Sequence, residues 1–119
     1  MAQMNMIIID SSFDSRGNTR AVLDQFNQVK VIGEFDNLVA GTEAAIREKP
    51  QLIFIDLSEN VELGIETIEK IVQKNKYCIV FVTSENVSTD LVLRAMRAGA
   101  REFLTKPVIF FTSITINCQ

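Results

Sequence analysis

The sequence predicts an α/β protein built on a doubly wound parallel sheet of five strands. Short apolar runs, of which residues 52–55 are the clearest, are typical of parallel strands buried on both faces. Between these runs lie windows in which apolar residues recur at helical spacing. The connections are short and favour right-handed crossovers, so we expect helices on both faces of the sheet.

The first half of the chain supplies three strands and two helices. The run before Asp10 is apolar and rich in isoleucine, as expected of a buried strand. Gly33 interrupts the second strand, and Pro50 ends the second helix because proline cannot continue the helical hydrogen bonds. We expect, in order, a strand at 6–9, a helix at 18–26, a strand at 29–35, a helix from Leu38 until Pro50, and a strand at 52–56.

The second half continues the alternation. Apolar residues recur at helical spacing from Val61 to Lys74, and an apolar strand follows at 78–82. Ser88 is suited to cap the next helix, and Gly99 to end it. A fifth strand at 101–105 completes the pattern.

The pattern breaks after residue 107. Residues 108–119 carry no charge and favour strand over helix, so a fifth covering helix is doubtful. We therefore divide the chain into a domain at 1–108 and an atypical or truncated segment at 109–119. Without a fifth helix, apolar side chains beside the first helix stay exposed, which favours self-association as a homodimer through this segment.

Composition excludes several classes of function. A length of 119 residues suits one domain, and the net charge of −3 argues against direct binding of nucleic acid. No apolar run reaches the length of a membrane span, and no signal peptide is apparent. Two cysteines do not form a disulfide framework, so we expect a cytoplasmic location. There is no histidine to act as a base, a metal ligand or a phosphoryl carrier.

Four polar side chains stand at the ends of four predicted strands: Asp10, Asp56, Thr83 and Lys106. The carboxyl ends of parallel strands share one edge of the sheet, where ligands collect in this architecture. Two carboxylates, a hydroxyl and an ammonium at one edge predict a site for a metal ion and a phosphoryl group.

The order and spacing of these residues resemble a response-regulator receiver domain, the phosphorylatable module of two-component signalling. Asp56 is followed eight residues later by Gly64, as in the family's Asp-to-Gly loop. Thr83 closes a strand, and residues 97–100 (RAGA) lead into 103–107 (FLTKP), which is similar to the family's signature around a Lys-Pro bond that is commonly cis. The resemblance covers residues 4–108 and implies a flavodoxin-like fold with strand order 2-1-3-4-5.

The resemblance also implies a role for each site residue. Asp56 is expected to accept a phosphoryl group from a sensor histidine kinase or a phosphotransfer protein. Mg²⁺ is expected on Asp10, Asp56 and the backbone carbonyl of Ser58. Thr83 and Lys106 are expected to contact the phosphoryl oxygens. The domain then signals to a downstream effector protein or domain, and it is no enzyme beyond slow autodephosphorylation.

Further residues are expected to control the conformational change on phosphorylation and the lifetime of the phosphorylated state. The resemblance assigns Ser58 and Glu85 to tuning the loss of the phosphoryl group to water. It also makes Thr83 and Phe103 a switch pair, in which the aromatic ring turns inward as the hydroxyl moves toward the phosphoryl group. A second interpretation of Phe103, as an ordinary core residue, stays open.

One residue departs from the family's pattern. The family usually has two adjacent acids after the first strand, whereas here Asp10 is followed by Ser11, so we expect weak binding of Mg²⁺. Asp14 lies nearby and is an alternative oxygen donor or a loop cap. Ser11 leaves a second function open, a phosphorylation-independent pseudo-receiver acting in interaction or dimerisation, as at the start of some pilus-assembly and localisation proteins. A small-ligand binder is disfavoured because no glycine-rich phosphate loop follows the first strand.

Overall fold

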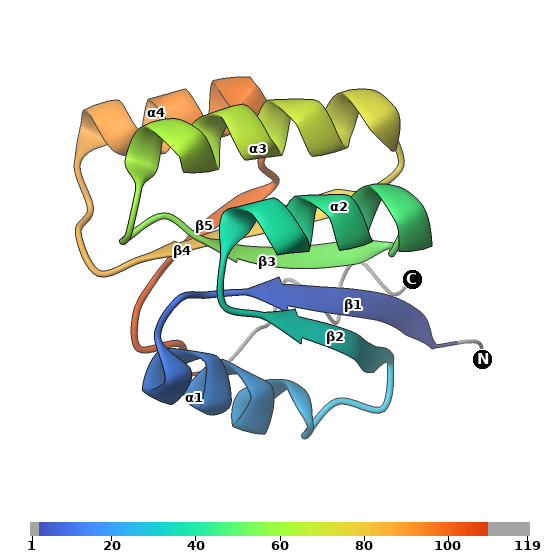
Figure 1. Ribbon diagram of the computed structural model, residues 1–119. Coiled ribbons are helices and arrows are strands. Elements are labelled where there is room, and N and C mark those ends of the chain that lie inside the picture. The colour runs from blue at the N-terminus through green and yellow to red at the C-terminus, as the bar shows by residue number, and fades with distance from the viewer. Residues whose placement is uncertain (1–2, 110–119) are drawn as a thin grey trace.

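The computed structural model describes residues 3–109, which form five strands and four helices in strict alternation (Figure 1). In chain order these are β1 (Met4–Ile9), α1 (Phe13–Leu23), β2 (Val29–Phe35), α2 (Leu38–Glu48), β3 (Leu52–Asp56), α3 (Val61–Lys74), β4 (Ile79–Ser84), α4 (Thr89–Ala98) and β5 (Glu102–Thr105).

All strand pairs are parallel, and the strand order is β2-β1-β3-β4-β5, so the predicted fold class is confirmed. Helix α1 covers one face of the sheet, and α2, α3 and α4 cover the other (Figure 1). Strands β1 and β3 lie in the middle of the sheet. Their carboxyl ends therefore open onto the centre of one edge, between the two helical layers.

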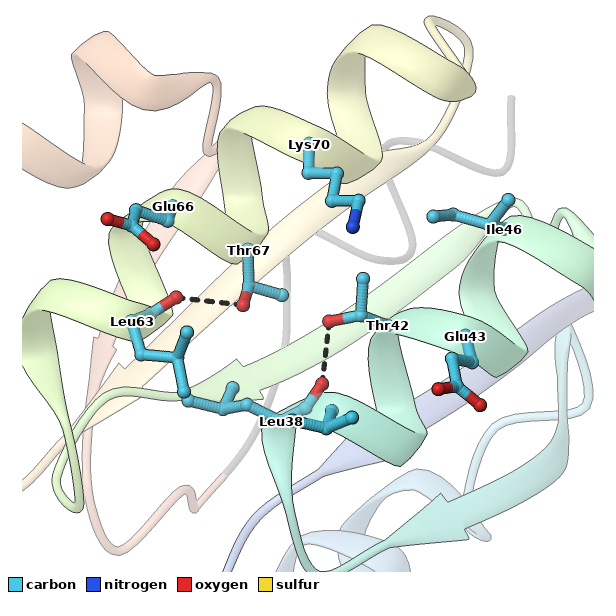
Figure 2. A pocket seen from close by; sticks show the side chains of 9 residues that line it. Leu38, Thr42, Glu43, Ile46, Leu63, Glu66, Thr67 and Lys70 are labelled. Atoms are coloured by element: carbon cyan, nitrogen blue, oxygen red, sulfur yellow. Dashed lines mark hydrogen bonds between the residues drawn. The ribbon is translucent and has the colours of Figure 1, made fainter.

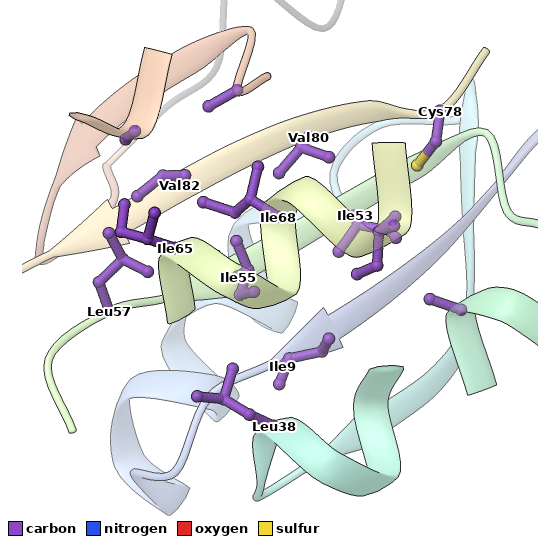
Figure 3. Close-up of a cluster of buried hydrophobic side chains, with 14 of the residues drawn as sticks. Ile9, Leu38, Ile53, Ile55, Leu57, Ile65, Ile68, Cys78, Val80 and Val82 are labelled. Atoms are coloured by element: carbon purple, nitrogen blue, oxygen red, sulfur yellow. The ribbon is translucent and has the colours of Figure 1, made fainter. Parts of the chain in front are cut away.

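The larger hydrophobic core lies between the sheet and helices α2, α3 and α4 (Figure 3). Ile53, Ile55 and Ile68 are wholly buried there, and burying such a side chain stabilises the fold by about 1.5–3 kcal/mol. The opposite core contains Phe54 and Phe81, whose rings lie 5.1 Å apart, together with Val22 and Leu23 of α1. The central strands are thus buried on both faces, as their apolar sequence predicted.

Helix α1 differs from the prediction, since it spans Phe13–Leu23 and not residues 18–26. It begins after Ser12, whose side chain accepts a hydrogen bond from the backbone N–H of Ser15. Gly17 lies within the helix, although glycine weakens a helix interior. The cap and the docking of α1 on the sheet outweigh that local preference.

The other elements match the expected ones to within about two residues, which is the usual uncertainty of element ends. Ser88 caps α4, and Gly99 ends it with a φ of 124°, as predicted. No helix among residues 3–109 is long and apolar enough to cross a membrane. The predictions for 109–119, including self-association, concern a segment of which only Ile109 belongs to the described residues.

Candidate functional site

Backbone hydrogen bonds fix the residues at the carboxyl edge of the sheet. The N–H of Asp10 donates to the carbonyl of Phe35, which extends the pairing of β1 and β2 by one residue. Asp56 pairs directly with Thr83 in the register of β3 and β4. The N–H of Lys106 donates to the carbonyl of Ser84, so the residue after β5 is held in the same way. The sheet itself therefore brings the four predicted side chains to one place.

The Asp56 carboxylate is buried and receives hydrogen bonds from several donors. Its Oδ1 accepts from Lys106 Nζ at 3.0 Å, from Thr83 Oγ1 at 3.2 Å and from Ser58 Oγ at 3.2 Å. Its Oδ2 accepts from the backbone N–H of Ser58 at 3.1 Å. Donors therefore meet both oxygens of the Asp56 side chain.

Lys106 lies between the two carboxylates. Its Nζ is 3.0 Å from Asp56 Oδ1 and 3.5 Å from Asp10 Oδ2. All three side chains are at most 7% exposed, so water screens their attraction little. The peptide bond from Lys106 to Pro107 is cis. The cluster combines two buried carboxylates with one ammonium.

The first turn of α1 holds Asp10, a feature that the sequence analysis missed. Ser12 donates its backbone N–H to Asp10 Oδ1 at 3.0 Å, and Ser15 Oγ donates to Asp10 Oδ2 at 2.5 Å. Arg16 donates from its guanidinium to the backbone carbonyl of Asp10 at 2.6 Å. The sequence pattern that indicates this helix start is Ser12, a preferred N-cap residue. Asp14 follows two residues later, and an acid is favoured in the first helical turn.

The remaining predicted residues lie around this cluster. Ser11 and Asp14 are exposed, and Asp14 lines a cavity of about 430 Å³ beside Lys106. Glu85 lines the same cavity, and its backbone N–H donates to Ser58 Oγ at 3.4 Å, so the two residues expected to tune dephosphorylation are in contact. Phe103 is half-buried and packs against the core beneath α2, α3 and α4.

The site offers a small set of oxygen donors to a metal ion. Asp10 and Asp56 point their carboxylates at the same ammonium, so both face one small volume. Within residues 3–109 no third acid, histidine or cysteine joins them to form a larger metal-binding group. Two carboxylates with neutral oxygens around them fit a hard divalent cation such as Mg²⁺, whose affinity falls as ligand charge is removed.

Comparison with known families gives one clear match. The sequence model of the response regulator receiver domain matches residues 6–112, which is most of the chain. The residues at the carboxyl edge of the sheet all lie inside the matched region.

Two curated relatives illustrate the range of similar proteins. The transcriptional regulatory protein BtsR of Escherichia coli strain K12 is 25% identical over 105 residues, covering 88% of this chain and 43% of the relative. The sensory transduction protein LytT of Enterococcus faecalis is 27% identical over 105 residues, covering 87% of this chain and 42% of the relative. The chain thus spans less than half the length of these relatives.

Two solved structures show the same fold. The signal receiver domain of the putative response regulator NarL from Mycobacterium tuberculosis has a TM-score of 0.86 at 20% identity, covering 99% of this chain and 97% of that domain. A response regulator protein from Burkholderia pseudomallei, solved with a phosphorylated aspartic acid, a calcium ion and citrate, has a TM-score of 0.78 at 22% identity. That comparison covers 98% of this chain and 67% of the other.

Proposed function

This chain belongs to the response regulator receiver domain family, and we propose that it is a phosphoacceptor switch that takes a phosphoryl group on Asp56. One observation carries the proposal: a buried carboxylate oxygen of Asp56 meets both the Lys106 ammonium and the Thr83 hydroxyl. Phosphoryl transfer to an acid needs a carboxylate nucleophile, and a neighbouring cation and hydroxyl donor stabilise the charge on the phosphoryl oxygens.

In the proposed reaction, an oxygen of the Asp56 carboxylate attacks the phosphorus of a phosphohistidine on a partner protein. The new O–P bond forms as the P–N bond breaks, and the electron pair of that bond stays with the imidazole nitrogen. Lys106 and Thr83 are already in contact with Asp56, and they are placed to donate to the phosphoryl oxygens as charge spreads over them.

We further propose that Asp10, Asp56 and the backbone carbonyl of Ser58 hold Mg²⁺. The ion, when bound, neutralises phosphoryl charge at the site. Because Ser11 provides a neutral side chain, this site carries fewer negative charges than one with a second adjacent acid, and its affinity for Mg²⁺ is correspondingly low. A protein of the same fold was solved with a phosphorylated aspartic acid and a calcium ion, which supports the pairing of acyl phosphate and divalent cation.

The switch then follows from the position of Thr83. When its hydroxyl moves from Asp56 to a phosphoryl oxygen, the contact between Thr83 and Asp56 is lost. Phe103 lies beside Val82, the residue before Thr83, in the register of β4 and β5, and it packs on the larger core. The ring can then turn inward and change the surface of α4 and β5, a two-state response of the kind that phosphorylation commonly biases. The phosphodonor is a sensor histidine kinase or phosphotransfer protein, and a downstream effector protein or domain reads the altered surface.

The test is labelling by phosphoramidate in the presence of Mg²⁺. We expect one phosphoryl group on the unmodified chain, none on Asp56→Asn, and slow labelling of Lys106→Ala. Circular dichroism checks that each variant is folded. Equal labelling of the unmodified chain and Asp56→Asn would place the acceptor elsewhere, and a folded chain that takes no label at all would favour a phosphorylation-independent interaction module.

A further inference from the structure

A groove lies between α2 and α3 (Figure 2). Leu38, Val39 and Ile46 line it from α2, and Leu63 lines it from α3. Val39 is 62% exposed and Leu63 is 37% exposed, so part of this apolar surface faces water. A second hollow shares Leu38, Val39 and Leu63 and extends the groove toward the start of α3.

The floor of the groove offers little hydrogen bonding. Thr42 Oγ1 donates to the carbonyl of Leu38 at 2.6 Å, and Thr67 Oγ1 donates to the carbonyl of Leu63 at 2.8 Å (Figure 2). Both hydroxyls are therefore turned onto their own helices. The cavity volume of about 230 Å³ is below the usual range for an enclosed small-molecule site. These features suit a few apolar side chains inserted from a partner.

The rim of the groove is acidic. Glu43 on α2 and Glu66 on α3 stand on the two walls, and Glu59 lines the adjoining hollow. None of these three glutamates takes part in an ion pair among residues 3–109. Glu62, in the first turn of α3, differs because it pairs with Arg94 at 2.7 Å, and the hydrogen bond from Arg94 lowers the pKa of Glu62. Lys70 is the single cation that lines the groove within these residues.

We propose that this groove binds an amphipathic helix of a partner protein whose apolar stripe is flanked by lysine or arginine. The α2 wall from Leu38 to Ile46 is roughly 12 Å long at the helical rise per residue. A helix that anchors through positions i, i+3, i+4 and i+7 has an apolar stripe of similar length. Basic flanks complement the glutamates on both walls, which sets the orientation and disfavours acidic partners. None of the four residues of the phosphoacceptor cluster lines the groove or the adjoining hollow.

The test uses two synthetic helical peptides with the same leucine stripe, one flanked by lysines and one by glutamates. Binding is measured by fluorescence anisotropy at about 0.15 M ionic strength, where long-range attraction is screened, and located from amide shifts of the ¹⁵N-labelled chain. We expect the lysine peptide to bind roughly tenfold or more tightly than the glutamate peptide, because like charges across an interface are unfavourable. Its shifts should centre on Val39, Glu43, Leu63 and Glu66.

Matched variants separate the groove from the general charge of the protein. Glu66→Lys should weaken the lysine peptide, whereas Glu69→Lys, an equal change at an exposed position on the same helix outside the groove, should not. Val39→Ser should weaken binding without changing the charge. Equal loss in both charge variants, or shifts centred elsewhere, would overturn the proposal. Concentration-dependent dimerisation that Glu66→Lys abolishes would also overturn it, since the occupant would then be a second copy.

Discussion

Asp10 is held on both carboxylate oxygens by residues of the first turn of α1. The N–H of Ser12 meets one oxygen, and the hydroxyl of Ser15 meets the other, which also faces Lys106. Groups that orient a metal ligand without touching the metal commonly affect affinity strongly. The orientation of Asp10 is therefore set by the helix cap as well as by the sheet.

Ser15→Ala is predicted to weaken the binding of Mg²⁺ about tenfold, because Asp10 loses the hydroxyl that orients it. Ser15→Thr keeps a hydroxyl and should retain most of the affinity. Isothermal titration calorimetry measures both variants independently of phosphorylation. Unchanged affinity in Ser15→Ala would mean that the Ser15 hydroxyl does not orient Asp10 for the ion.

Ser11→Asp is predicted to tighten the binding of Mg²⁺ and to speed labelling by phosphoramidate. The change adds a carboxylate beside Asp10 and so raises the ligand charge of a hard-cation site. Ser11 is exposed, so the new side chain requires no change in packing. If titration shows no gain, then position 11 does not face the ion.

Cys78 provides a prediction for alkaline pH. Burial raises the pKa of its thiol from 9.0 to about 12, so the folded chain resists forming a thiolate that the unfolded chain forms readily. The thiol's contribution to stability is therefore complete below pH 9.0 and is lost as the pH rises toward 12.

At about pH 10 this loss amounts to about 1.4 kcal/mol, which is the value of one pKa unit. Cys78→Ala should remove it. The free energy of unfolding, measured by urea denaturation, should therefore fall less between neutral pH and pH 10 in the variant than in the unmodified chain. Parallel pH profiles would show that this thiol does not couple to folding.

At the scale of elements, helix α2 approaches β1 closely because Gly41 lacks a side chain. A Cβ at Gly41 would lie 2.6 Å from two atoms of Ile9, a buried residue next to Asp10. Gly17 in α1 is the opposite case, since a Cβ there would meet nothing within 4 Å. Close packing therefore requires a glycine at position 41, whereas position 17 has room for a side chain.

Gly41→Ala is predicted to destabilise the fold by roughly 1–3 kcal/mol, because the added methyl overpacks the contact with Ile9. Gly17→Ala should stabilise it by about 0.5–1 kcal/mol, through the better helix propensity of alanine. Thermal or urea unfolding measures both changes. A stabilising Gly41→Ala would show that α2 can move away from β1 without cost.

The elements also show what local sequence can and cannot predict. Helix α3 and strand β3 were predicted to the residue, because long apolar periodicity and a continuous buried run each leave few alternatives. Helix α1 was misplaced, because the apolar residues between Ala21 and Phe26 predicted a helix at 18–26, whereas the helix spans Phe13–Leu23. The contacts of Ser12 and Ser15 with Asp10 were missed for the same reason, since they exist only if the helix begins at Phe13.

For the whole molecule, the sheet order explains why the four strand-end residues meet. β1 and β3 are neighbours in the centre, and β4 and β5 follow. Asp56 and Thr83 lie within the β3–β4 ladder, and a backbone hydrogen bond beyond a ladder positions Asp10 and Lys106. This convergence could be predicted from strand ends and topology alone. The hydrogen bonds on each carboxylate oxygen could not, because they depend on side-chain rotamers and on the first turn of α1.

The molecule has two surfaces with separate expected partners. The cavity beside Lys106 adjoins the phosphoacceptor, and the acidic groove between α2 and α3 lies on the outer helical layer. The chain spans less than half the length of BtsR and LytT.

The most direct test of the proposed phosphorylation of Asp56 identifies which residue carries the phosphoryl group. After labelling with phosphoramidate and Mg²⁺, borohydride reduction converts an aspartyl phosphate to homoserine, which peptide mass spectrometry then locates. We expect homoserine at position 56 and at no other aspartate. Homoserine at Asp10 or Asp14, with Asp56 intact, would contradict it.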